Sequence, residues 1–228
     1  MRRMPRLSAL AAALSMVAIA IGPIPASAAS VGFGTHYAVE ITTEAYGDGY
    51  VRYKINSVFP NNLEVAAIGN GFAPTYMLAG VRSGWIQSDY TRYTGPNGGS
   101  ITVKIWGTFQ RELVGGISVG SLGGFRSTIK VALRDLSTGT DAKTWTLENE
   151  EVLCVGASLG MVSLGDCNGP ESRTFGSPFT KTGSGVGIVS NHNYAIRVYA
   201  GSIVQFAGTA FGAQTITTTR GLSGSLTW

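Results

Sequence analysis

Charged side chains are scarce in this sequence of 228 residues, because Asp, Glu, Lys and Arg together make up only 13% of it. Histidine and cysteine are scarcer still, with two residues each. Catalysis and metal binding draw on clusters of these side chains, so the composition predicts no metal site, no cofactor and no conventional active site. Beyond the N-terminal segment, no run has the roughly 18 apolar residues of a membrane-spanning helix, so a membrane partner is not indicated.

The N-terminal segment has the pattern of a secretory signal peptide. Three arginines within the first six residues precede an almost uncharged run over residues 7–22, and Ala26, Ser27 and Ala28 supply a small-residue cleavage site. We expect residues 1–28 to be removed, leaving a single domain of residues 29–228 that is extracellular or associated with the cell envelope. The net charge of +4 then falls to +1, which argues against a nucleic-acid partner.

The two cysteines, Cys154 and Cys167, are 13 positions apart. An exported chain matures in an oxidising compartment, so we expect them to form a disulfide bond. Closing a loop of this size stabilises the folded chain by about 3 kcal/mol on the chain-entropy model. A redox or metal-binding role is disfavoured, because the sequence has no CxxC motif.

Hydrophobic residues alternate with polar ones along most of the remaining chain, which is the pattern of half-buried strands. Glycine and Pro74 predict a loop or a short helical turn over Leu63–Gly80. The turn residues 137–141 predict a hairpin. The pattern as a whole predicts an all-β fold, an antiparallel β-sandwich of jelly-roll-like type. The expected strands are 35–43, 50–59, 100–113, 127–136, 143–148, 193–199, 202–211, 215–219 and 222–228.

Few residues suggest chemistry. His192 is next to Ser190 in a polar segment, where an ordinary turn residue is favoured over a catalytic base. Glu148, Glu150 and Glu151 follow a predicted strand, and a solvated strand end is favoured over a pair of glycosidase carboxylates. Asp135 and Asp141 flank the predicted hairpin, where a turn is favoured over a calcium site. We therefore assign no catalytic and no metal-binding residue.

Aromatic residues on the polar side of predicted strands are better candidates for a functional role. Trp106 lies among threonine, lysine and glutamine at alternate positions, so its ring should be exposed. Tyr50 lies on the same side of its predicted strand as Arg52, and Arg197 shares a strand side with Tyr199. Flat rings beside hydrogen-bonding groups are typical of a surface that binds a sugar. These five residues are the predicted ligand-binding residues.

The expected function is that of a secreted, non-catalytic binding or surface-associated protein, with a glycan or a cell-envelope component as its partner. Two alternatives stay open. A secreted hydrolase acting on polysaccharide would use the glutamates or His192. An outer-membrane β-barrel would also alternate along its strands and end on an aromatic residue, as Leu222, Leu226 and Trp228 do here.

Overall fold

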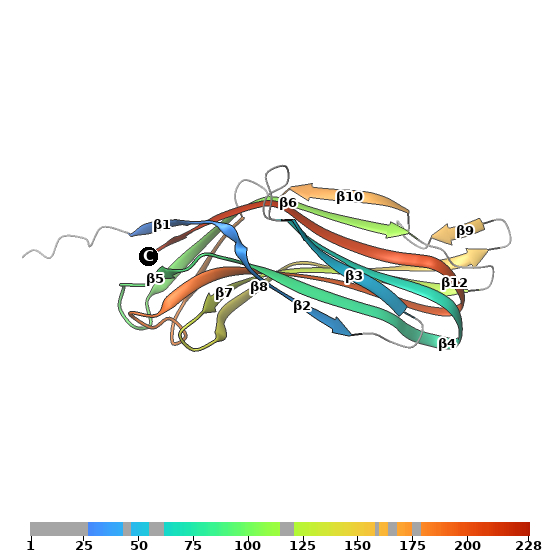
Figure 1. Ribbon diagram of the computed structural model, residues 1–228, viewed down its shortest axis with the longest axis horizontal. Coiled ribbons are helices and arrows are strands. Elements are labelled where there is room, and N and C mark those ends of the chain that lie inside the picture. The colour runs from blue at the N-terminus through green and yellow to red at the C-terminus, as the bar shows by residue number, and fades with distance from the viewer. Residues whose placement is uncertain are drawn as a thin grey trace, which may run out of the picture.

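The computed structural model describes residues 27–42, 47–54, 62–114, 121–157, 160–163, 168–174 and 179–228. This part of the chain forms 12 strands, and it has no helix long and apolar enough to cross a membrane (Figure 1). In chain order the strands are β1 Ala28–Val31, β2 Phe33–Thr42, β3 Gly47–Lys54, β4 Asn62–Ser88, β5 Thr91–Arg92, β6 Ser100–Val114, β7 Leu122–Asp135, β8 Thr140–Ala157, β9 Gly160–Ser163, β10 Asn168–Thr174, β11 Phe179–Ser184 and β12 Asn193–Thr227.

Two strands of unusual length organise the fold. β4 has 27 residues and β12 has 35, and they pair antiparallel from Arg197 opposite Gln87 to Thr219 opposite Leu63. The register shifts three times between Val204 and Ala213, where both strands bend and fold over together (Figure 1). Because of these bends, each strand belongs to two layers of the molecule.

The first layer contains β2, the second half of β4, the first half of β12, β7, β8 and β9 in that order. The second layer contains β3, the first half of β4, the second half of β12 and β6, which also pairs with β10 and β11. Every pairing is antiparallel, and β1 adds to the end of β12. The predicted all-β antiparallel fold is therefore confirmed, and the two layers form a sandwich.

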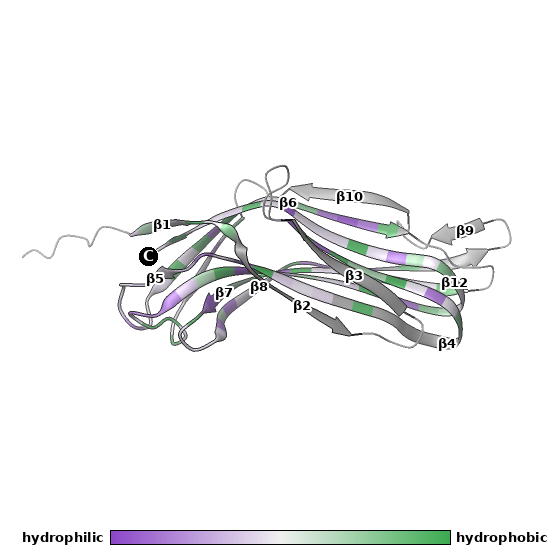
Figure 2. Cartoon of the chain, in the orientation of Figure 1, coloured by the Kyte–Doolittle hydropathy of each residue, from purple (hydrophilic) through white to green (hydrophobic). Residues whose placement is uncertain are grey.

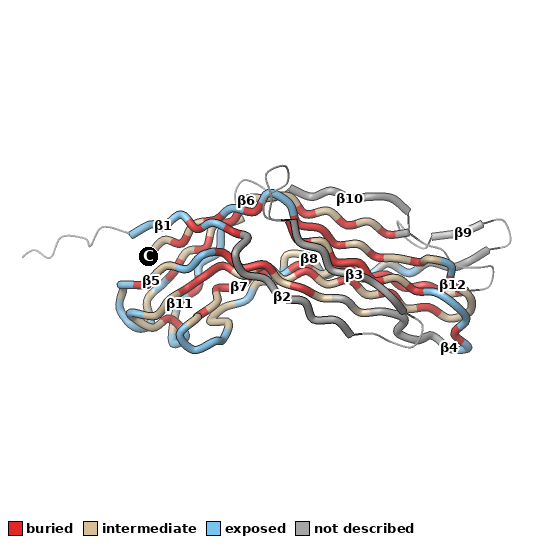
Figure 3. Tube along the Cα trace, viewed as in Figure 1, coloured by how far each residue is buried: buried red, intermediate tan, exposed pale blue. Residues whose placement is uncertain are grey.

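Hydrophobic side chains at alternate positions along the strands fill the space between the two layers. Figure 2 shows hydrophobic and hydrophilic residues alternating along β12, and Figure 3 shows the matching pattern of burial. Burying each such side chain stabilises the fold by about 1.5–3 kcal/mol. The first layer contributes Ile129, Val131, Leu133, Ile196 and Val198, and the second contributes Ile101, Val103, Ile105, Leu222 and Leu226.

A second, smaller core lies toward the bends. It contains Phe125, Val204 and Phe206 together with alanines from β4 and β12. Near the middle of the sandwich the interior is polar, because Thr215, Thr217 and Thr219 are all fully buried. The Thr215 and Thr217 hydroxyls donate to the backbone carbonyls of Ile203 and Gly201, each at 3.0 Å, whereas the Thr219 hydroxyl has no hydrogen-bond partner in the described part of the chain.

The expectation of a loop or helical turn over Leu63–Gly80 was wrong, because this segment is part of β4. Its glycines and Pro74 are accommodated at the bend, where the register with β12 shifts between Ala73 and Met77. The expected strands after residue 193 are likewise one bent strand, β12. The tertiary pairing of β4 with β12 overrides the local breaker signals.

Removal of the signal peptide and formation of the disulfide bond both stay predictions. Ala28 pairs with Thr227, the last residue of β12, and Ser27 exchanges backbone hydrogen bonds with the C-terminal residue, Trp228. Cleavage after Ala28 would remove Ser27 and Ala28 from the mature chain. Cys154 lies in β8, but Cys167 lies outside the described residues, so the disulfide bond also remains a prediction.

Candidate functional site

The outer side of the first layer combines aromatic, cationic and hydroxyl side chains, and we call it the first-layer face. It is centred on Tyr199 of β12, whose register partners are Trp85 of β4 on one side and Lys130 of β7 on the other. These residues alternate with the buried Val198 and Ile86, so they point away from the core. Three neighbouring strands therefore present their side chains on one surface.

Arg197 is held over the indole ring of Trp85. Its guanidinium carbon lies 3.8 Å from the ring centroid, a distance typical of a cation–π interaction. Arg197 also donates two hydrogen bonds to the amide oxygen of Gln87, at 3.0 Å from Nε and 2.6 Å from Nη2. Gln87 is 3% exposed, so it fixes the arginine from below. The cation is thus positioned before any ligand arrives.

Tyr199 is fixed in a similar way. Its hydroxyl donates to Asp141 Oδ2 at 2.7 Å, and Asp141 Oδ1 accepts from Arg134 Nη1 at 3.0 Å. Partial burial raises the pKa of the Tyr199 hydroxyl above its usual value of 10.0, and the hydrogen bond to Asp141 raises it further. Tyr199 is therefore neutral at physiological pH, and its ring is held in one orientation.

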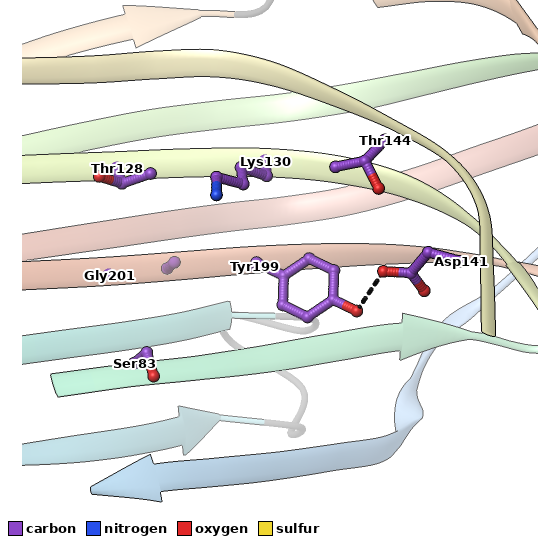
Figure 4. A pocket seen from close by; sticks show the side chains of 8 residues that line it. Ser83, Thr128, Lys130, Asp141, Thr144, Tyr199 and Gly201 are labelled. Atoms are coloured by element: carbon purple, nitrogen blue, oxygen red, sulfur yellow. Dashed lines mark hydrogen bonds between the residues drawn. The ribbon is translucent and has the colours of Figure 1, made fainter. Parts of the chain in front are cut away.

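A recess of about 450 Å³ lies beside Tyr199 on this face. Its residues come from four strands, and Figure 4 shows the Tyr199 to Asp141 hydrogen bond at one side of it. Gly201 has no side chain to fill the space next to the tyrosine ring. The volume falls within the range of about 300–1,000 Å³ common for small-molecule sites. The recess is lined by Ser83, Thr128, Lys130, Asp141, Thr144, Tyr199, Ala200 and Gly201.

This arrangement suits a polyhydroxylated ligand better than a reaction. The hydroxyls, the ammonium group of Lys130 and the Asp141 carboxylate offer donors and acceptors, while the tyrosine ring offers an apolar surface. Lys130 has no ion pair within the described part of the chain, so its charge is available to a ligand. Asp141 is occupied by Tyr199 and Arg134, which does not fit a general base waiting for a substrate.

The structure brings together only some of the predicted ligand-binding residues. Arg197 and Tyr199 share the first-layer face, whereas Trp106 of β6 lies opposite Ser223 in the second layer. Its side chain is 40% exposed, as the alternation predicted, but it points out of the opposite side of the sandwich. Tyr50 and Arg52 lie on β3, opposite Ala66 and Glu64, and their side chains are outside the described residues.

The expectation of a solvated strand end at the glutamates was wrong for Glu148. Its side chain is 10% exposed and forms an ion pair at 3.7 Å with Arg111, which belongs to the other layer. Glu151 points outward and pairs with Arg126. The side chain of Glu150 lies outside the described residues. Glu148 thus forms a buried ion pair that links the two layers, and local sequence patterns do not reveal such a partner.

Asp135 organises the β7–β8 turn, as the hairpin prediction required. Its Oδ1 accepts from the backbone nitrogens of Ser137 at 2.8 Å and Thr138 at 3.3 Å, and its Oδ2 lies 2.8 Å from His192 Nδ1. Asp135 and Asp141 have different partners, and no group of three or more metal-binding side chains exists among the described residues. The turn interpretation is confirmed, and His192 serves as a partner of this turn.

The sequence analysis did not assign Trp85, Lys130 or Asp141 to the ligand-binding residues. Lys130 does alternate with Ile129 and Val131 in a predicted strand, so its outward direction was available from the pattern. Trp85 was obscured because Tyr90 and Ile86 lie at the other alternate positions of its segment. Their common location depends on the pairing of β4, β12 and β7, which are far apart in sequence.

No family model and no curated protein matches this sequence. Among solved structures, the chain is similar to the enzymatically active domain of tailspike protein 4 of bacteriophage CBA120, with 6% identity and a TM-score of 0.32 over 82% of this chain. It spans 19% of that protein's length. A family 11 carbohydrate-binding module from Clostridium thermocellum aligns with 87% of this chain and 96% of its own, at 13% identity and a TM-score of 0.23. At TM-scores this low, neither neighbour defines the fold or the ligand of this chain.

Proposed function

We propose that this protein is a secreted, non-catalytic module that binds a glycan, such as a component of the cell envelope, on its first-layer face. The recess beside Tyr199 is the observation that supports this most directly. A sugar ring would lie against the tyrosine, and its hydroxyl groups would exchange hydrogen bonds with Ser83, Thr128 and Thr144. Lys130 would bind an acidic or hydroxyl oxygen at the edge of the site.

Rigidity of the site supports binding rather than turnover. Asp141 holds Tyr199, and Gln87 holds Arg197, so a ligand would immobilise few side chains when it binds. Each side chain that is already ordered saves about 0.5–1.5 kcal/mol of binding free energy. Preorganisation of this kind favours recognition of an extended ligand lying across several strands.

The test is a titration of the purified protein with soluble cell-wall and plant polysaccharides, neutral and acidic, while tryptophan fluorescence is followed. Trp85 lies next to Tyr199, so a ligand on this face should change its emission. Released reducing ends are assayed in the same samples. We expect saturable binding without product, weakened at least about tenfold in Tyr199→Ala, which corresponds to the loss of one stacked ring and its hydrogen bond.

Trp106→Ala is the matched control, because it removes an exposed ring from the opposite side of the sandwich. Under this proposal it leaves the affinity unchanged. Loss of binding in Trp106→Ala with retention in Tyr199→Ala would move the site to the second layer. Release of reducing ends would contradict the proposal and show that the protein is a hydrolase.

A further inference from the structure

The end of the sandwich where β4 and β12 bend presents two exposed aromatic rings. Phe72 on β4 is 63% exposed and Phe211 on β12 is 70% exposed. Phe72 lies opposite Thr209 and Gly71 lies opposite Ala210, so the two phenylalanines are on adjacent strands within a few positions of each other. The bend of β4 lies toward one end of the long axis of the molecule (Figures 1 and 3). We call residues 70–74 and Phe211 the aromatic tip.

Both strands that form the aromatic tip are uncharged over long stretches. No Asp, Glu, Lys, Arg or His occurs between Glu64 and Arg82, or between Arg197 and Arg220. Moving a charged side chain out of water costs much free energy. The absence of charged side chains on these stretches therefore removes the largest barrier to inserting them into an apolar phase. The rest of the surface of the tip consists of Asn70, Pro74 and small residues.

Two backbone nitrogens of β12 next to the aromatic tip have side-chain partners within the protein. The side chain of Asn70 accepts from the backbone nitrogen of Gly212 at 2.7 Å, and Ser121 Oγ accepts from the nitrogen of Thr209 at 2.9 Å. Immediately beneath, Ala73 and Ala210 are buried in the smaller core. The tip is therefore anchored on a packed core and holds its two rings outward.

A second copy of the chain is a poor partner for this feature. A buried aromatic side chain contributes about 150–250 Å², so two partly exposed rings fall well short of the roughly 800 Å² per partner in a stable interface. A lipid bilayer needs no complementary shape and accepts a small uncharged wedge. We propose that the aromatic tip inserts into the interfacial region of a lipid bilayer. In that orientation the first-layer face lies along the side of the molecule and stays open to solvent.

The test is co-sedimentation of the purified protein with phosphatidylcholine vesicles, with and without phosphatidylglycerol, at low and high salt. Because the tip is uncharged, we expect binding to both compositions with little salt dependence. The double variant Phe72→Ser with Phe211→Ser should weaken vesicle binding at least about tenfold, since most of the inserted apolar surface is lost. Tyr90→Ser is the matched control, because Tyr90 is 58% exposed at the opposite end and should leave binding unchanged.

Phe211→Trp gives a positive readout that does not depend on loss of function. Its emission should shift to the blue on vesicle binding and be quenched by lipids brominated near the headgroup. Unchanged emission, or equal binding by the double variant, would overturn the proposal. Dimerisation in solution that the double variant abolishes would also overturn it, in favour of a second copy. Glycan binding by the Tyr199 site is measured without lipid, so failure of either proposal leaves the other standing.

Discussion

The two ends of the sandwich reverse the chain by different physical means. At the end containing the β7–β8 turn, the chain leaves the sheet and side chains hold the loops. Asp135 accepts two backbone hydrogen bonds there, and the Tyr194 hydroxyl accepts from the nitrogen of Val189 at 2.8 Å. At the other end β4 and β12 pass from one layer to the next without leaving the sheet, and glycines take up the bend.

This difference is reflected in where β4 and β12 carry charge, because neither strand has a charged residue through its bend. The loop end needs polar side chains because its backbone groups have no strand partner. The bend end keeps most of its strand pairing, so its sequence is not required to carry polar side chains and tolerates a long uncharged stretch. Stability at the loop end should therefore depend on particular side chains, and stability at the bend end on particular backbone conformations.

Removing a buried ring from the loop end should have the largest effect. Tyr194 is fully buried and meets Tyr93 edge to face, with 6.0 Å between ring centroids. Tyr194→Ala should lower the free energy of unfolding by about 3–5 kcal/mol, measured by urea denaturation. Tyr90→Ala, which truncates an exposed ring at the same end, should stay within about 0.5 kcal/mol. Similar losses in both variants would show that this end does not rely on its buried side chains.

The bend end should instead be sensitive at a glycine. Gly208 has φ 89°, and a Cβ there would lie 2.8 Å from Ser121 Cβ and 3.1 Å from its Cα. Gly212 has φ 64° with no atom within 4 Å of such a Cβ. Gly212→Ala should cost about 1 kcal/mol from backbone strain alone, and Gly208→Ala about 2–3 kcal/mol because steric overlap is added. Equal costs in the same denaturation assay would mean that the contact with Ser121 does not constrain the bend.

The smallest effect is a loss of stability at alkaline pH that originates at the loop end. Burial raises the pKa of Tyr93 and of Tyr194 above 10.0. The folded state therefore binds more protons than the unfolded state above pH 10, so stability from these groups is complete below pH 10 and declines as the pH rises. The decline in urea midpoint between pH 9 and 11.5 should be shallower in Tyr194→Phe. An unchanged slope would assign the alkaline loss to other groups.

Alternation along single strands was enough to predict much of the core. Ile129, Val131 and Leu133 are buried as the pattern indicated, and Trp145 packs against the same core. The outward direction of Arg197 and Tyr199 was available from the same pattern. These two residues of the candidate site were thus accessible before the fold was known, because a side chain's direction depends on its position in its own strand.

Alternation does not say which layer a strand joins, and this is where the sequence interpretation ended. Trp106 and Tyr199 both point outward, yet they emerge from opposite sides of the molecule. Glu148 looked like one of three surface acids, and only the other layer supplies Arg111 as its partner. Trp85 and Lys130 join Tyr199 through pairings between residues far apart in the chain.

The sequence by itself determined the all-β class, and for the strands with clear alternation it determined the side that faces the core, because that side depends on neighbours two positions apart. Only the tertiary structure decided that β4 and β12 continue through glycines and Pro74, which face is recessed, and that Phe72 and Phe211 are both exposed at the same bend. Those outcomes depend on long-range pairing, whose energy exceeds the local preferences for a break.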